Sequence, residues 1–116
     1  MIFYHRTRAA RKILREGFRD SVRFIGGLKL RGIWLSDFPL DCNEGAKGNE
    51  LLEITLPDSC EVSRYELIEE GKPYREWCIP ARTIQKVGSI RLLSDEEEHH
   101  LPRHWDKLNW PSKEEA

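Results

Sequence analysis

The feature that most constrains the fold is the hexapeptide Gly-Ile-Trp-Leu-Ser-Asp at residues 32–37, which is followed by a loop rich in Pro, Asn and Gly. Its alternation of period two predicts a strand with Ile33 and Leu35 on the core face and Trp34 and Ser36 on the other. An aromatic ring beside a hydroxyl, at a strand end next to a loop, suits a flat polar ligand. Burial of Trp34 in the core is the alternative interpretation.

A strand followed by a helix is expected at the start of the chain. The apolar-aromatic run at residues 2–5 predicts a first strand. Thr7 is expected to cap a helix over residues 8–16, since apolar residues recur there at helical spacing, and Gly17 follows as a C-terminal signal. This unit is the clearest local structure in the sequence.

Most of the other expected elements are strands. Apolar alternation and turn residues predict them at residues 22–30 (a hairpin around Gly26-Gly27), 51–56, 62–68, 77–79 and 90–93, and residues 44–46 are compatible with a helical turn. We therefore expect a compact, strand-rich α+β domain with one main helix over residues 1–93. Residues 94–116, which open with a run of acids, are expected to form a charged C-terminal appendage.

Composition favours a single small domain. A chain of 116 residues has room for one core. No apolar run approaches the roughly 20 residues of a membrane span, and early basic residues interrupt any secretory apolar segment, so a cytoplasmic location is expected. The three cysteines lack C-x-x-C spacing, which indicates reduced thiols.

The net charge of −1 conceals an asymmetry along the chain. Residues 1–31 hold nine Lys and Arg against two acids, whereas residues 32–116 hold ten against eighteen. One interpretation is a basic surface for a phosphate-bearing ligand or a nucleic acid. The other is that the two parts pair with one another across the fold.

Two further residues are candidates for chemistry. His5, close to the end of the first strand, is suited to donate a hydrogen bond to a ligand hydroxyl, because one ring nitrogen can donate while a neighbour fixes the other. A packed histidine with one hydrogen bond is the alternative. Glu76 stands in an apolar segment between Tyr74 and Trp77, where a carboxylate is costly to bury unless it is paired or used. A solvated glutamate on an edge is the alternative there.

Other site types receive little support from the sequence. His99, His100 and His104 lack an accompanying acid or cysteine pattern, so no metal site is expected. The chain contains no G-x-G-x-x-G, P-loop, nucleophile-elbow or H-E-x-x-H motif. Cys78 would need a basic partner to act as a nucleophile, and the sequence indicates none.

Taken in order, Tyr4-His5-Arg6-Thr7, the 32–37 hexapeptide and Glu76-Trp77-Cys78-Ile79 resemble the three motifs of the ADP-ribosyltransferase fold. The resemblance is to its diphtheria-toxin and poly(ADP-ribose) polymerase branch, named for His, Tyr and Glu, with Trp34 in place of the tyrosine. It covers roughly residues 2–93 but depends on about a dozen positions. It implies a split β-sheet domain.

The resemblance also implies roles for individual residues. Glu76, His5 and Trp34 would be catalytic: Glu76 would bind the ribose 2′-hydroxyl and promote transfer, His5 would bind the same ribose, and Trp34 would lie against the nicotinamide ring. The NAD-binding set would be Tyr4, His5, Arg6, Thr7, Trp34, Ser36 and Phe38, with the Arg6 backbone holding the carboxamide. NAD would be a substrate.

Three departures from the family pattern bear on activity. Arg6 replaces a glycine, so its side chain is expected either to crowd the pocket or to contact a phosphate. Trp34 keeps the stacking surface of the family tyrosine and loses the hydroxyl. The loop after Asp37 lacks the Ser-x-x-x-Tyr-like element that covers the nicotinamide, for which Phe38 is the candidate substitute.

The resemblance therefore implies an NAD-dependent ADP-ribosyltransferase with an unidentified protein or nucleic-acid acceptor and no membrane partner. A catalytically degenerate module that binds a nucleotide, a nucleic acid or a protein is the alternative, favoured by the Arg6 substitution and the basic first 31 residues. An enzyme that transfers a phosphate of RNA through NAD-like chemistry is a third interpretation.

Overall fold

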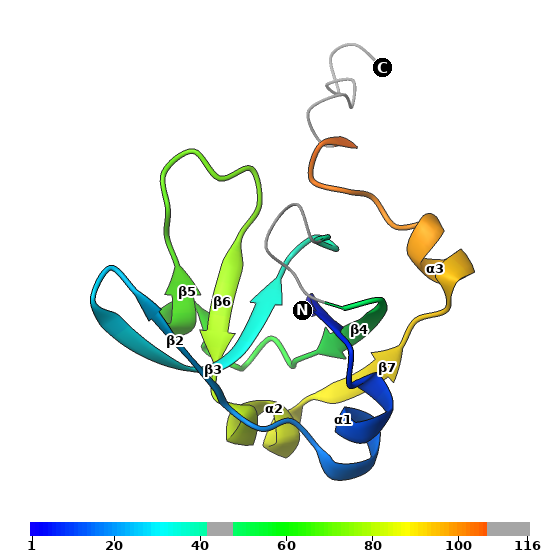
Figure 1. The fold of residues 1–116 in the computed structure, drawn as a ribbon, viewed down its shortest axis with the longest axis horizontal. Coiled ribbons are helices and arrows are strands. Elements are labelled where there is room, and N and C mark those ends of the chain that lie inside the picture. Colours follow the sequence, from blue (N-terminus) through cyan, green and yellow to red (C-terminus); the bar gives the residue numbers. More distant parts are fainter. Residues whose placement is uncertain (42–47, 107–116) are drawn as a thin grey trace.

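The computed structural model of the protein describes residues 1–41 and 48–106 (Figure 1). In that part of the chain, seven strands form one antiparallel sheet in the order β5-β6-β3-β1-β4-β7, with β2 paired to β3 outside this path. The elements are β1 (Ile2–Thr7), α1 (Ala10–Glu16), β2 (Ser21–Ile25), β3 (Leu28–Ser36), β4 (Glu50–Thr55), the 3₁₀ helix η2 (Val62–Tyr65), β5 (Glu66–Leu67), β6 (Glu76–Ile79), α2 (Ala81–Val87), β7 (Ser89–Leu92) and α3 (Asp95–His99). The expected α+β class is confirmed.

The core lies on one face of the sheet, where α1 and α2 cover it (Figure 1). In β3 the predicted alternation holds, since Ile33 and Leu35 are 3% and 1% exposed. They join a cluster with Phe3 from β1 and with Ile84 from α2. Burial of each such side chain contributes about 1.5–3 kcal/mol, so this face supplies much of the folding free energy.

The sheet opens between β1 and β3. Six residue pairs join β1 to β4, and four join β3 to β6. A single pair, Tyr4 with Ser36, joins β1 to β3. The two strands diverge beyond that pair, which leaves backbone groups between them without ladder partners.

The first helix begins later than the sequence predicts. Thr7 is still in the β1–β4 ladder, opposite Glu50, so it cannot be the residue that starts the helix. The N-cap is Ala9, whose N–H donates to Thr7 Oγ1 at 3.0 Å, and the helix starts at Ala10. The C-terminal prediction is confirmed, because Gly17 has φ 85° and its N–H donates to Ile13 O at 2.7 Å.

The strand expected at residues 62–68 is wrong for most of its length. Val62–Tyr65 form η2, and only Glu66–Leu67 pair with β6. Alternation is necessary for a half-buried strand but does not supply a partner, and within residues 1–41 and 48–106 no strand pairs with residues 62–65.

Helix α2 was not predicted from the sequence. It is seven residues long and buries Ala81 and Ile84. The Ala81 N–H donates to Asp20 Oδ1 at 2.8 Å, so a residue 61 positions away satisfies its N-terminus. The helical turn considered at residues 44–46 lies outside the described residues.

Helix α3 follows a capping box in which Glu97 N–H donates to Ser94 Oγ and Ser94 N–H donates to Glu97 Oε1, both at 3.1 Å. Its acids lie in its first turn, where the helix dipole favours negative charge. Glu98 pairs with Arg6 of β1, so the segment after residue 93 is tied to the sheet. The domain boundary at residue 93 stays a prediction.

Candidate functional site

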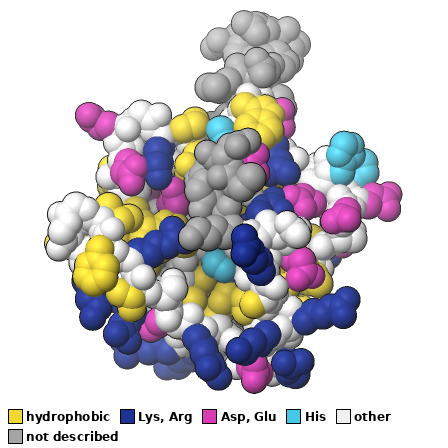
Figure 2. Space-filling model, in the orientation of Figure 1, with side chains coloured by type: hydrophobic (Ala, Val, Ile, Leu, Met, Phe, Trp, Pro, Cys, Tyr) yellow, Lys and Arg dark blue, Asp and Glu magenta, His cyan; other side chains and the backbone are white. Residues whose placement is uncertain are grey.

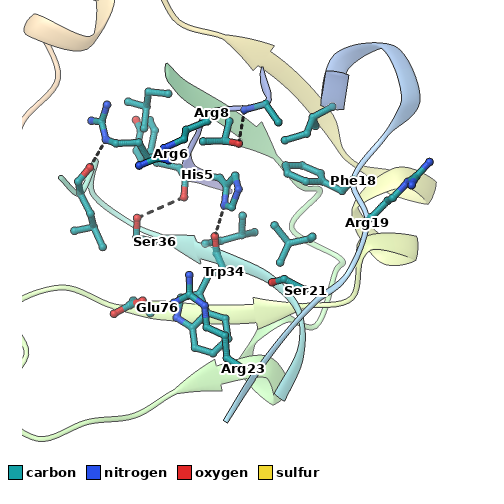
Figure 3. A pocket seen from close by; sticks show the side chains of 18 of the residues that line it. His5, Arg6, Arg8, Phe18, Arg19, Ser21, Arg23, Trp34, Ser36 and Glu76 are labelled. Carbon is teal, nitrogen blue, oxygen red and sulfur yellow. Dashed lines mark hydrogen bonds between the residues drawn. The ribbon is translucent and has the colours of Figure 1, made fainter. Parts of the chain in front are cut away.

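A cavity of about 610 Å³ lies at the opening between β1 and β3 (Figure 3). Most of the residues selected from the sequence line it: Tyr4, His5, Arg6, Thr7, Trp34, Ser36 and Glu76. Phe38 is absent from the lining, and its backbone carbonyl accepts the Ser36 hydroxyl at 2.6 Å. The cavity therefore brings together all three sequence motifs without the residue expected to cover the ligand.

His5 is held by the backbone of the neighbouring strand. Its Nδ1 lies 2.7 Å from the carbonyl oxygen of Trp34, and since a carbonyl only accepts, Nδ1 carries the proton. Phe18 packs edge-on against the ring at 5.3 Å between centroids. Burial lowers the pKa of His5, the Trp34 hydrogen bond opposes that shift, and the charge of Arg23 adds to it. The neutral ring then presents Nε2 as an acceptor, not the donor that the sequence suggested.

The ring of Trp34 is half-buried and already has a neighbour on one face. The guanidinium carbon of Arg23, from β2, lies 4.6 Å from the ring centroid. This is a cation–π contact within the usual range. A ligand ring that stacked on that face would displace Arg23, so the stacking surface is shared between Arg23 and any ligand.

Tyr4, Ser36 and Glu76 form one row across three strands. Tyr4 is opposite Ser36, and Ser36 is opposite Glu76, so the three side chains share a face of the sheet. Ser36 and Glu76 are 5% and 8% exposed. Burial raises the pKa of Tyr4, and the carboxylate of Glu53 adds to that shift, which keeps the phenol protonated.

Glu76 is the first residue of β6 and is buried with a charged partner. Its Oε1 accepts Lys72 Nζ at 2.7 Å, and Glu69 lies 3.2 Å from the same ammonium group. Burial alone would lower the pKa of Lys72, but the hydrogen bonds to Glu76 and Glu69 outweigh it and raise that pKa. The carboxylate thus has one oxygen engaged by a permanent cation.

The side chain of Arg6 is committed elsewhere. Its Nε donates to Leu40 O at 2.5 Å, and its guanidinium pairs with Glu98, which also accepts Arg103 at 3.2 Å. Only 8% of the Arg6 side chain is exposed. Its guanidinium is thus engaged by the Leu40 carbonyl and by Glu98 of α3, and the two expectations for this residue, crowding of the pocket and contact with a phosphate, stay predictions.

Three lining or supporting residues were missed in the sequence: Phe18, Arg23 and Lys72. Contacts between residues far apart in the chain carry no local signal. Lys72 lies four residues before Glu76, but that spacing indicates a contact only on a helix, and residues 72–75 are irregular, with a bend at 73–74.

Other chemistry finds no support in the described residues. Residues 1–41 and 48–106 contain no group of three or more His, Cys, Asp or Glu that could hold a metal ion. Cys78 is 7% exposed, and burial raises the pKa of its thiol, which disfavours the nucleophilic thiolate. None of the helices in this part of the chain is long and apolar enough to cross a membrane.

Comparison with protein-family models, with curated proteins and with solved structures gave no match to this chain.

Proposed function

We propose that the protein is an ADP-ribosyltransferase that takes ADP-ribose from NAD. One observation carries the proposal: His5, Trp34, Ser36 and Glu76, chosen from three separate motifs, line a single cavity at the opening of the sheet. The cavity is of the size that small-molecule sites have, about 300–1,000 Å³. Its lining combines the aromatic rings of Tyr4, Phe18 and Trp34 with many charged and polar side chains.

Each group has a step that it can support. Transfer breaks the bond between ribose C1′ and the nicotinamide nitrogen, which leaves with the bonding electrons, and forms a bond from C1′ to an acceptor atom that loses its proton. Positive charge grows on the ribose between these events, and the buried carboxylate of Glu76 is suited to stabilise it. The neutral ring of His5 can accept a hydrogen bond from a ribose hydroxyl at Nε2.

The proposal has a direct test on Glu76. Glu76→Gln keeps the shape and removes the charge, so we expect nicotinamide release from NAD to fall by 100-fold or more, on the order of losing one strong electrostatic contact. NAD binding, measured by calorimetry, is expected to change less than threefold. Glu69→Gln is the matched control, because Glu69 also contacts Lys72 but is exposed.

The outcomes separate the interpretations. Loss of turnover in Glu76→Gln alone supports the assignment, whereas equal loss in both variants would assign the effect to Lys72. Unchanged nicotinamide release in Glu76→Gln would refute the catalytic role. His5→Ala is expected to weaken NAD binding. An unchanged affinity for NAD in this variant would mean that NAD binds outside the cavity.

A second candidate function is a binding module without turnover. Arg23 occupies one face of Trp34, and Lys72 neutralises Glu76, so both groups that the chemistry needs are already engaged. Saturable nucleotide binding without nicotinamide release in the wild-type protein would favour this function.

The transferase proposal includes a cytoplasmic location, since NAD is a metabolite of the cell interior.

A further inference from the structure

The basic residues of the first 31 positions are mostly unpaired. Of the nine, Arg6 pairs with Glu98, and Arg15 lies 4.0 Å from its neighbour Glu16. The other seven form no ion pair with any acid in the described residues: Arg8, Arg11, Lys12, Arg19, Arg23, Lys29 and Arg31. The interpretation that the two parts of the chain neutralise each other therefore fails for these residues.

Four of these cations lie around the candidate site. Arg8, Lys12, Arg19 and Arg23 line the cavity, and all four are exposed. They come from the segment after β1, from α1, from the α1–β2 connection and from β2. Figure 3 shows Arg8 and Arg23 on opposite sides of His5, with Arg19 further out beyond Phe18. We call these four residues the cationic rim.

Few acids oppose the cationic rim. The acids that line the cavity are Glu16, Glu69 and Glu76, and Lys72 pairs with the last two, which leaves one net negative charge on those three side chains. The dense acidic cluster of the described residues is on α3 (Figure 2), where Asp95, Glu96, Glu97 and Glu98 follow one another. Lys and Arg instead gather around the lower edge of the view, over α1 and α2 (Figure 2).

The cationic rim exceeds what the sugar-nucleotide donor needs. NAD carries one negative charge on each of two adjoining phosphates, so two cations balance it and the four residues of the cationic rim leave two positive charges over. Four exposed cations from separate elements instead suit a longer run of phosphates that crosses the mouth of the cavity.

We propose that the acceptor is a single-stranded nucleic acid, held by the cationic rim with one nucleotide directed into the cavity; this rests on the proposed transferase function. A nucleobase that is paired in a duplex could not approach Glu76, because Glu76, the first residue of β6, is only 8% exposed. A nitrogen or oxygen of that nucleotide would bond to ribose C1′ as nicotinamide leaves with its electron pair. The proton that the nucleophile loses would pass to water.

The first experiment measures binding without NAD. Fluorescence anisotropy with a labelled oligothymidylate of about 20 nucleotides gives the affinity between about 50 and 200 mM salt. Four phosphate contacts predict a slope of log K against log salt of about −3 for a single strand. Arg19→Gln with Arg23→Gln is expected to reduce the slope by about 1.4 and to weaken binding at least tenfold at low salt.

The matched control removes the same charge from the same region. Arg11→Gln with Arg15→Gln changes two exposed arginines of α1 that do not line the cavity. We expect this variant to lose less than threefold in affinity, and circular dichroism checks that both variants fold. An equal loss in both double variants would overturn the proposal, because net charge alone would then explain binding. Tighter binding of a duplex of the same length would overturn it as well.

The second experiment separates this proposal from the proposed function. The protein is incubated with NAD labelled in its adenylate part and with the same oligonucleotide, and label on the oligonucleotide is measured. Label that Glu76→Gln abolishes and that the cationic-rim variant reduces supports the proposal. NAD turnover without oligonucleotide binding would refute the acceptor and leave the transferase. Oligonucleotide binding without NAD binding would refute both the acceptor role and the transferase.

Discussion

The contact that joins the C-terminal segment to the candidate site gives the sharpest prediction. Glu98 of α3 accepts from Arg6 of β1 and, at 3.2 Å, from Arg103. The side chains are 8% exposed for Arg6, 16% for Glu98 and 23% for Arg103. Arg103 also donates to Pro39 O at 3.1 Å, so the cluster ties α3 and the segment after it to the end of β3.

The expected cost of disrupting the cluster follows from its burial. Glu98→Gln keeps the volume and leaves two guanidinium groups facing each other without the carboxylate charge. Removing one partner of a fully buried ion pair costs about 3–5 kcal/mol, because the remaining charge is left uncompensated. Partial solvation of Glu98 and Arg103 reduces this, and we expect a loss of about 2–4 kcal/mol in the free energy of unfolding.

The assay is urea unfolding followed by circular dichroism, with the free energy of unfolding extrapolated to water. Glu97→Gln is the control, since it lies on the same helix and Gln can still serve in the capping box. Its partner Arg91 is 57% exposed and Glu97 itself 44%, so solvent screens that pair and we expect it to contribute little to stability. Glu98→Gln within 0.5 kcal/mol of the control would refute the argument and make residues 94–106 a separable appendage.

Two further predictions test the site and the sheet. Because folding lowers the pKa of His5 below 6.5, the unfolded chain binds more protons there, so its stabilising contribution is present above pH 6.5 and is lost as the pH falls below it. His5→Asn is expected to reduce the fall in unfolding free energy between pH 7 and 5, and an unchanged slope would contradict this. Gly32→Ala would put a Cβ 2.9 Å from Ile79 O, which we expect to cost about 1–3 kcal/mol more than Gly71→Ala, where φ is 82° and the space is open. Equal unfolding free energies for the two variants would refute that steric argument.

Much of the sheet could be predicted because its signals are local. Alternation in the 32–37 hexapeptide selected the buried side chains of β3 correctly, and glycines marked the turn between β2 and β3. The errors lie where a distant partner decides the structure. The N-terminus of α2 depends on Asp20, which accepts from the Ala81 N–H, and β5 has only two residues because only Glu66–Leu67 pair with β6.

The site shows the same division between local and distant signals. Residue type and order selected His5, Trp34, Ser36 and Glu76, and the topology brings them to one cavity. The sequence could not show that Arg23 covers Trp34 or that Lys72 pairs with Glu76, because each contact depends on how two chain segments meet in space. The position of the Arg6 guanidinium depends on its ion pair with Glu98, which is 92 residues away in the sequence.

The cavity and the tautomer of His5 have one origin. If β1 and β3 remained paired beyond Tyr4 and Ser36, the Trp34 carbonyl would accept a backbone N–H from β1. The strands diverge instead, and that carbonyl accepts a hydrogen bond from His5 Nδ1 at 2.7 Å. With the proton held on Nδ1, Nε2 is an acceptor. The opening that makes room for a ligand therefore also fixes the ring that would bind it. A substitution that restored continuous pairing would remove the cavity and the ligand-facing tautomer together.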